Sequence, residues 1–220
     1  MQPLSDLRSW TVFAIALLTG CASAPPKPNY GPFRADNPHS ILVVPVINRS
    51  VDVNAPDYFL ATITRPLAER GYYVFPVNMV RSVLSDDGLS DANLVHSGDP
   101  RRLGELFGCD AIMYISIERW DARYVVLSTT VTVELTYHLK SARSGQELWT
   151  NHQTVVYQPR NGGAGIAGLL ADAVAAAITK AAPNYIPLAR QANAGAIDLK
   201  HTGLPAGPHD SMYLKDSDEY

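Results

Sequence analysis

The sequence predicts a single α/β domain, with a mixed sheet of parallel and antiparallel strands flanked by helices. Two observations lead to this fold class. The apolar run at residues 41–47 and the aromatic, β-branched run at 72–77 bracket a helical pattern, which is the layout of a βαβ unit. Apolar and polar residues then alternate through 130–140, and a partner run at 147–157 follows a turn. We therefore expect parallel pairing in the first half of the sheet and antiparallel pairing in the second.

A helix is predicted between the first two strands. Apolar residues from Phe59 to Leu67 recur at helical spacing, and Pro56 lies near the expected first turn. Gly71 fits the C-cap region, where a left-handed residue ends many helices. Pro66 falls inside the pattern, so we expect a kink or a break at that point.

Shorter helices are predicted before the third strand. One is expected after Asn78, and a turn-rich stretch follows it at residues 85–97. Asp99-Pro100 then marks the start of another helix, and Gly108 marks its end. The residues of this helix that we expect to face inward are Leu103, Leu106 and Phe107. The third strand is predicted at residues 110–120.

The chain changes character after the third strand, where the alternating pattern begins, and the turn of the hairpin is expected at Ser144-Gly145. Gly162-Gly163-Ala164-Gly165 is expected to be a flexible joint. Residues 166–182 are then predicted to form an apolar, alanine-rich helix. Such a helix is buried on the sheet, lies in a subunit interface or, as the least favoured alternative, enters a bilayer. A further amphipathic segment is expected at residues 185–200.

The start of the chain has the layout of a bacterial lipoprotein signal. An apolar run at residues 10–18 follows a short polar start and ends in Leu18-Thr19-Gly20-Cys21. This tetrapeptide fits the lipobox, in which cleavage between Gly20 and Cys21 leaves a cysteine whose thiol carries diacylglycerol. Thr19 and Gly20 are small enough to give the peptidase access to the backbone. The run is too short for an uncleaved anchor, which needs about 20 apolar residues.

These features divide the chain into four expected parts: a signal peptide at 1–20, a lipidated cysteine with a proline-rich tether at 21–38, an α/β domain at 39–200 and a tail at 201–220. A proline-rich tether is extended, and residues 22–38 would reach on the order of 50 Å. The tail is rich in Pro, Gly and Asp and is expected to be loose. Ala22 stands where Asp would favour retention in the inner membrane, so we predict an outer-membrane location with the domain in the periplasm.

Composition argues against several classes of site. The formal net charge of −3 and the pI of about 6.0 lack the basic footprint of a nucleic-acid-binding protein. With Cys21 assigned to lipid, Cys109 has no disulfide partner and is expected to be buried. His138 and His152 fall on the two strands of the hairpin, but two histidines alone make a poor metal site. Because recognisable catalytic and nucleotide motifs are missing, we predict no catalytic residues, cofactor or metal, and expect a protein that is not an enzyme.

Four segments of the chain are distinctive: the lipobox, the strand at 41–47 with Pro45, the run Gly71-Tyr72-Tyr73-Val74-Phe75-Pro76-Val77, and the run Leu204-Pro205-Ala206-Gly207-Pro208-His209. Together they make the chain resemble a family of Gram-negative lipoproteins without an established function. The resemblance implies a fold similar to the amino-terminal domain of TolB and related to CsgG and to the lipoprotein activators of peptidoglycan synthases. It also implies an accessory role in the envelope, for which a transport apparatus is one candidate. A homodimer is one assembly that the resemblance allows.

Two functional hypotheses follow. In the first, the lipid on Cys21 holds a non-catalytic protein-interaction module at the membrane, and envelope proteins bind to its sheet edges or its apolar helix. In the second, the protein is a periplasmic carrier with a pocket for a small molecule or lipid beneath the helix at 166–182. The first is favoured, because an anchor joined to a domain without recognisable chemistry is typical of such a module. Mixed α/β folds also host enzymes, so only the missing site argues against catalysis.

Overall fold

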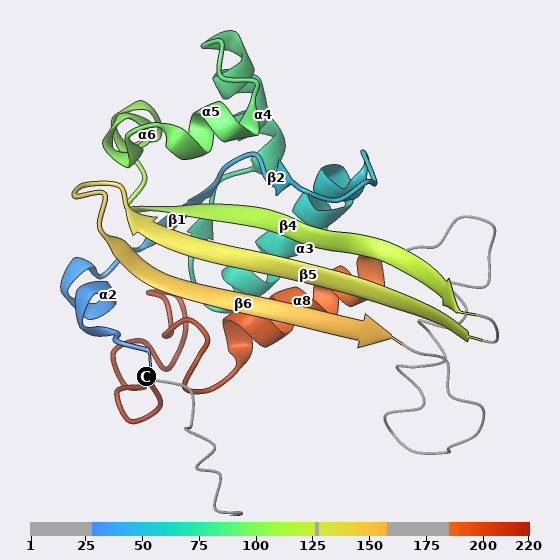
Figure 1. Ribbon diagram of the computed structural model, residues 1–220. Coiled ribbons are helices and arrows are strands. Elements are labelled where there is room, and N and C mark those ends of the chain that lie inside the picture. Colours follow the sequence, from blue (N-terminus) through green and yellow to red (C-terminus); the bar gives the residue numbers. More distant parts are fainter. Residues whose placement is uncertain (1–27, 126–127, 158–184) are drawn as a thin grey trace, which may run out of the picture.

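The computed structural model describes residues 28–125, 128–157 and 185–220, and one mixed sheet runs through them (Figure 1). The strands are β1 Ser40–Val43, β2 Ile47–Asn48, β3 Tyr73–Val74, β4 Ala111–Val125, β5 Ser128–Ser141 and β6 Glu147–Tyr157. Their order is β3-β1-β4-β5-β6, and β2 pairs separately with β4. β1 is parallel to β3 and β4, whereas β4, β5 and β6 are antiparallel. The predicted change from parallel to antiparallel pairing is confirmed.

Pro45 divides the predicted first strand in two. β1 ends at Val43, and β2 begins at Ile47. Proline has no N–H to donate to a ladder, so the chain leaves the sheet here and returns when Ile47 pairs with Ser116 of β4. β3 is also shorter than expected, because the chain turns at Pro76 into the next helix.

The helix α3 runs from Ala55 to Glu69, close to the predicted bounds. Gly71 follows its end with a φ of 90°, the left-handed conformation that glycine adopts without strain. The helix continues through Pro66, so the alternative of a break is wrong. Proline removes only its own N–H, and Ile63 and Leu67 on either side are fully buried in the core, which holds the last turn in place.

The helix α6, Pro100–Phe107, has the predicted caps. The Asp99 side chain accepts a hydrogen bond from the Arg101 N–H, and Gly108 is left-handed with a φ of 67°. Leu103 is buried as expected, but Leu106 is 45% exposed, so its inward orientation was wrong. The helix buries only a narrow face, the one that carries Leu103, and Leu106 lies outside that face.

Two more helices, α4 (Val77–Asp86) and α5 (Ala92–Ser97), precede α6. The first matches the short helix expected after Asn78. The second occupies the end of the stretch that was expected to be turns. It begins because the Asp91 side chain accepts a hydrogen bond from the Asn93 N–H, and it buries Val95.

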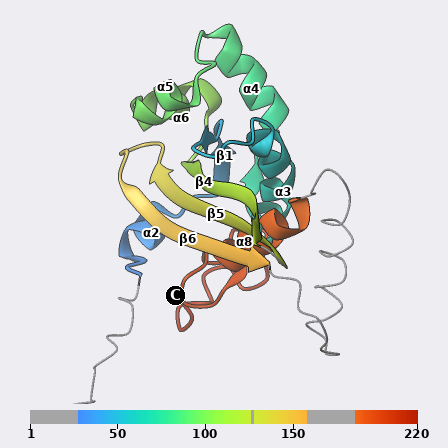
Figure 2. The same cartoon turned by 45° about the vertical axis from the view of Figure 1, so that its right-hand side comes forward.

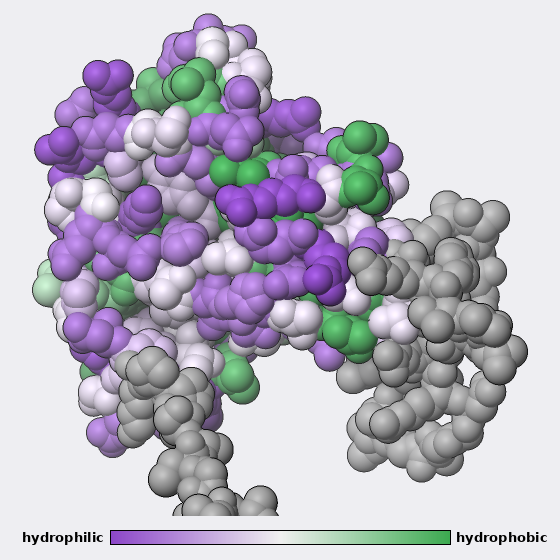
Figure 3. Space-filling model, in the orientation of Figure 1, coloured by the Kyte–Doolittle hydropathy of each residue, from purple (hydrophilic) through white to green (hydrophobic). Residues whose placement is uncertain are grey.

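Helices cover the two faces of the sheet unequally (Figures 1 and 2). On the inner face, α3 and α8 (Ile186–Asp198) lie behind β4, β5 and β6. α8 falls within the amphipathic segment that was predicted at residues 185–200. The buried strand residues in this core are Met113, Ile115, Ile117, Val131, Val133, Leu135, Tyr137 and Leu139. On the outer face, α4, α5 and α6 form a second cluster with Leu42, Ile112 and Tyr114. The rest of the outer face, on β5 and β6, is turned to solvent (Figure 3).

A chain of buried polar groups positions α3 and α8 on the sheet. The Tyr137 hydroxyl on β5 donates to Asn193 Oδ1 on α8 at 2.7 Å, and Asn193 Nδ2 donates to Thr62 Oγ1 on α3 at 2.9 Å. Thr62 Oγ1 in turn donates to the Phe59 carbonyl at 2.6 Å. All three side chains are at most 3% exposed. Because each group is satisfied only in this arrangement, the chain favours one placement of the two helices.

Both ends of the domain differ from the expectation. Part of the expected tether is folded: α2 spans Gly31–Asp36, and Tyr30 and Phe33 are buried. The expectation of a loose tail at 201–220 is also wrong, because Leu204 and Asp216 are buried. Apolar burial and hydrogen bonding in these two segments offset the conformational entropy that the residues lose when they are ordered.

Several predicted features lie outside the described residues. They are the lipobox with Cys21, the joint Gly162-Gly163-Ala164-Gly165 and the apolar helix at 166–182. Within residues 28–125, 128–157 and 185–220, the helices are too short or too polar to cross a membrane.

Candidate interaction surface

β6 is the last strand of the described sheet, and β5 pairs with only one of its sides. An unpaired edge presents backbone N–H and C=O groups to any extended chain, and natural edges are commonly blunted by shortness, lysine or proline. The opposite edge, β3, has two residues and is soon followed by Pro76. β6 has eleven residues, Glu147–Tyr157, and contains neither lysine nor proline. It is therefore the edge of this sheet best suited to accept another strand.

Side chains along β6 alternate between two environments. Trp149 and Asn151 point toward the C-terminal segment, and both donate hydrogen bonds to the Thr202 carbonyl, at 2.9 and 3.0 Å. The residues between and beyond them, Thr150, His152 and Thr154, are exposed on the outer face. One face of the strand is thus secured to the domain, and the other face is exposed to solvent. Within the described part of the chain, residues 28–36 contact the start of β6, so the later part of the strand is the more open part of the edge.

His138 and His152 lie on this outer face as diagonal neighbours in the register of β5 and β6. His138 Nδ1 is 2.6 Å from Glu147 Oε2, and His152 Nε2 is 3.3 Å from Glu134 Oε1. Each histidine therefore has its own carboxylate. Among the described residues, His, Cys, Asp and Glu do not gather in the groups of three that hold a metal ion. The view in Figure 3 shows a mainly hydrophilic face with scattered apolar side chains.

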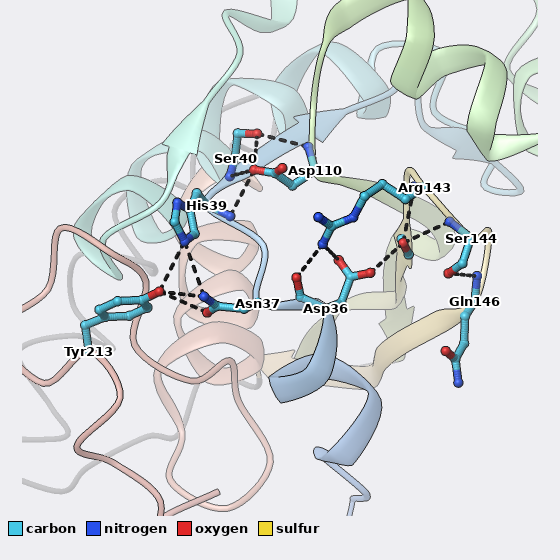
Figure 4. Close-up of polar contacts among 10 residues, drawn as sticks. Asp36, Asn37, His39, Ser40, Asp110, Arg143, Ser144, Gln146 and Tyr213 are labelled. Atoms are coloured by element: carbon cyan, nitrogen blue, oxygen red, sulfur yellow. Dashed lines mark hydrogen bonds and ion pairs between the residues drawn. The ribbon is translucent and has the colours of Figure 1, made fainter.

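A Ser–His–Asp group at the start of β1 has the composition of a hydrolase site but not its geometry. Ser40 Oγ donates directly to Asp110 Oδ2 at 2.8 Å, and the His39 and Ser40 backbone N–H groups donate to the same oxygen. The His39 ring turns away, toward Asn37 and Tyr213 (Figure 4). A catalytic triad needs the imidazole between the serine and the acid. This group instead joins the start of β1 to the start of β4.

A second polar group in Figure 4 ties α2 to the β5–β6 turn. Ser141 Oγ donates to Asp36 Oδ2 at 2.7 Å, and Arg143 Nη2 donates to the Asp36 carbonyl at 2.5 Å. The N–H groups of Arg143 and Ser144 donate to Ser141 Oγ. Asp36, which was expected in a free tether, is therefore a fixed part of the domain.

The motifs at residues 71–77 and 204–209, on which the family resemblance rests, meet through backbone contacts. The Gly207 N–H donates to the Arg70 carbonyl at 2.8 Å, and the His209 N–H donates to the Gly71 carbonyl at 3.0 Å. A Cβ on Gly71 would lie 2.5 Å from the Asp210 nitrogen, and one on Gly207 would lie 2.6 Å from the carbonyl carbon of Gly71. Glycine is required at both positions because no side chain fits between the two segments.

Arg70 closes this contact with its side chain. Its Nε donates to the Leu204 carbonyl at 2.7 Å, and its Nη2 lies 3.4 Å from Asp216 Oδ2. The same carboxylate oxygen accepts the Ala206 N–H at 2.6 Å. Sequence reasoning identified both motifs but missed that they meet. The apolar residues Leu204 and Ala206 on either side of Pro205 were a signal that this segment is anchored to the core.

Cys109 is buried, as predicted, with 7% of its surface exposed. Burial raises the pKa of its thiol from 9.0 to about 11, and the charge of Asp110 adds to the increase. The thiol is therefore protonated at neutral pH and behaves as a small apolar group.

Two cavities in the described part of the chain bear on the carrier hypothesis. One of about 160 Å³ lies between α3 and α4, beside Asp57 and Arg81. Another of about 240 Å³ lies between Pro28 and Trp149 at the start of β6. Pockets for small ligands are usually about 300–1,000 Å³, so both are small. The pocket that the carrier hypothesis needs, beneath residues 166–182, lies outside the described residues.

Comparison with known proteins assigns the chain to a family. The family described as "Putative lipoprotein GNA1162-like" matches residues 28–209. The chain belongs to this family. The match spans the described domain up to the end of the motif at 204–209, so it includes both glycine-containing segments that contact each other.

A curated protein and a solved structure, both from Neisseria meningitidis, are similar to this chain. The chain is 36% identical over 162 residues to "Putative lipoprotein NMB1124/NMB1162" of serogroup B, covering 73% of this chain and 75% of that protein. The crystal structure of lipoprotein GNA1162 aligns with a TM-score of 0.55 and 37% identity, covering 64% of this chain and 98% of that chain. The predicted resemblance to a lipoprotein family and the predicted mixed α/β fold are both confirmed.

Proposed function

We propose that this chain is an outer-membrane lipoprotein, anchored through Cys21, whose domain is a non-catalytic protein-interaction module of a cell-envelope assembly. Membership of a lipoprotein family supports the anchor. The observation that carries the interaction role is β6, an eleven-residue edge strand that lacks the usual protection of lysine or proline. An extended segment of a partner adds to such an edge through main-chain hydrogen bonds.

The surface beside this edge defines what kind of segment fits. The exposed side chains of Thr150, His152 and Thr154 would contact alternate residues of an added strand. Glu147 and Glu134 lie beside His138 and His152, and Arg119 also pairs with Glu134, so the added strand meets a polar surface that carries charges of both signs. Main-chain bonds therefore supply most of the affinity, and polar cross-strand pairs supply selectivity.

Two adjacent proline substitutions test the edge. Successive N–H groups of an antiparallel strand point to opposite sides, so one of Thr154→Pro and Val155→Pro removes a bond to β5 and the other removes a free N–H. The variant that loses more thermal stability is the one whose N–H is bonded to β5. We expect the other variant to keep more of its thermal stability but to lose its partner. Native partner affinity in that variant would contradict the proposal.

The partner and the anchor are identified in cells. A photo-crosslinking residue at Thr154 is expected to capture an envelope protein, while the same residue at Ser82, exposed on α4, serves as the control. Capture from Ser82 alone would move the contact to another face. Labelled palmitate is expected in the native chain and not in Cys21→Ala, and separation of the two membranes reports which one holds the protein.

A further inference from the structure

The described domain is secured to its fold from its first residues onward. Tyr30 is 6% exposed, and its hydroxyl donates to the Gly203 carbonyl at 2.7 Å. Phe33 is 4% exposed in the main core. Arg34 Nη2 donates to the carbonyl of Tyr220 at 2.9 Å, and the Tyr220 ring packs edge-on against Tyr30 at 5.4 Å. These residues cannot serve as free tether while the domain is folded.

Covalent geometry then limits how far the domain stands from its anchor. Residues 22–27 separate Cys21 from Pro28. Seven steps from one Cα to the next span at most about 25 Å, whatever conformation these residues adopt. This bound is about half of the 50 Å that a tether extending to residue 38 would allow.

β6 begins beside the point where this short connection enters the domain. Pro28 lines a cavity together with Glu147, Trp149 and Thr150, which are the first residues of β6. The strand runs on for eleven residues, about 35 Å at 3.2–3.4 Å per residue. The whole edge therefore lies within about 60 Å of Cys21.

We propose that the β6 edge works beside the membrane that holds Cys21 and receives an extended segment of a protein belonging to that same membrane. This inference rests on the proposed anchor. The segment has to approach within about 60 Å of the acylated residue, and a partner held in the same membrane can do so without leaving that membrane. The C-terminus lies beside α2, the first described helix, whereas the loop between β2 and α3 lies at the far end of the domain (Figures 1 and 2). This loop carries Val51, which is 90% exposed.

The orientation is tested with the full lipidated chain in vesicles of phosphatidylethanolamine and phosphatidylglycerol that carry an acceptor dye on a lipid headgroup. Donor dyes are placed at Ser217→Cys, three residues from the C-terminus, and at Val51→Cys, because buried Cys109 does not compete for the label. We expect stronger energy transfer from position 217 than from position 51. Equal transfer from both positions would overturn the orientation. Vesicle flotation shows independently whether the chain is anchored.

The reach is tested by lengthening the connection. About twenty Gly/Ser residues are inserted between Lys27 and Pro28, and the matched control carries the same insertion at Gly88, an exposed turn with no atom within 4 Å of a built Cβ. Effective concentration falls roughly as the −3/2 power of tether length, so crosslinking from Thr154 is expected to fall about five- to tenfold. Unchanged or increased crosslinking would overturn the inference, whereas missing palmitate would refute only the anchor of the proposed function.

Discussion

Replacement of Gly71 by alanine tests how the C-terminal segment is held against the end of α3. Gly71 has a φ of 90°, which alanine adopts only with strain. The new Cβ would lie 2.5 Å from the Asp210 nitrogen and 3.0 Å from the Gly207 carbonyl oxygen. Both atoms belong to the backbone, so the substitution must push residues 207–210 away from the helix end.

The expected cost has three parts. The left-handed conformation costs alanine about 1–2 kcal/mol. Overpacking costs about 1–3 kcal/mol. Displacement of the segment weakens the hydrogen bond from the Gly207 N–H to the Arg70 carbonyl, at about 1 kcal/mol. The total is about 4 kcal/mol, which for a domain of this size lowers Tm by roughly 8–16 °C.

Thermal unfolding of the unlipidated Cys21→Ala chain provides the assay. Gly88→Ala is the matched control, because Gly88 has a φ of 77° but no atom within 4 Å of a built Cβ. It is expected to show only the conformational cost, about 1–2 kcal/mol. Gly207→Ala has the clash without a positive φ and is expected to fall between the two. If Gly71→Ala is as mild as Gly88→Ala, the reasoning about the close contact is refuted.

The remaining predictions concern the side chains of Asn193, Cys109 and His96. Asn193→Leu removes the bridge between the hydroxyls of Tyr137 and Thr62 and is expected to cost about 2–4 kcal/mol in urea unfolding, less than additively with Tyr137→Phe. For Cys109, the raised pKa of about 11 implies roughly a hundredfold less thiolate at about pH 8 than for an ordinary thiol, so alkylation should be slow until the chain is unfolded. The folded state binds this proton more tightly, so its contribution to stability should be lost as pH rises from about 9 to 11, and not in Cys109→Ala. Burial lowers the pKa of His96, which contacts the Pro45 carbonyl, and Lys140 and His138 lower it further. The unfolded state then binds more protons, so thermal stability should fall as pH drops below about 6.5, and less steeply in His96→Gln.

Local signals predicted the elements whose stability depends on neighbours in sequence. The hairpin partner was expected at 147–157, and β6 has these bounds, because alternation and a Ser144-Gly145 turn act within a few residues. The caps of α6 at Asp99 and Gly108 followed from the same local chemistry. The two strands divided or shortened near Pro45 and Pro76 show the limit of this reasoning. There the apolar pattern continues, but the loss of an N–H matters only once a neighbouring strand is in place.

The sequence by itself determined the fold class, the family motifs and the six residues that separate Cys21 from Pro28. Only the tertiary structure showed that Gly71 and Gly207 are in contact, that Tyr30 and Phe33 belong to the core, and that β6 is the exposed edge. The physical reason is the range of the interactions. Periodicity, capping and turn chemistry act between residues close in the chain, whereas strand order and the packing of chain ends depend on contacts between segments more than a hundred residues apart.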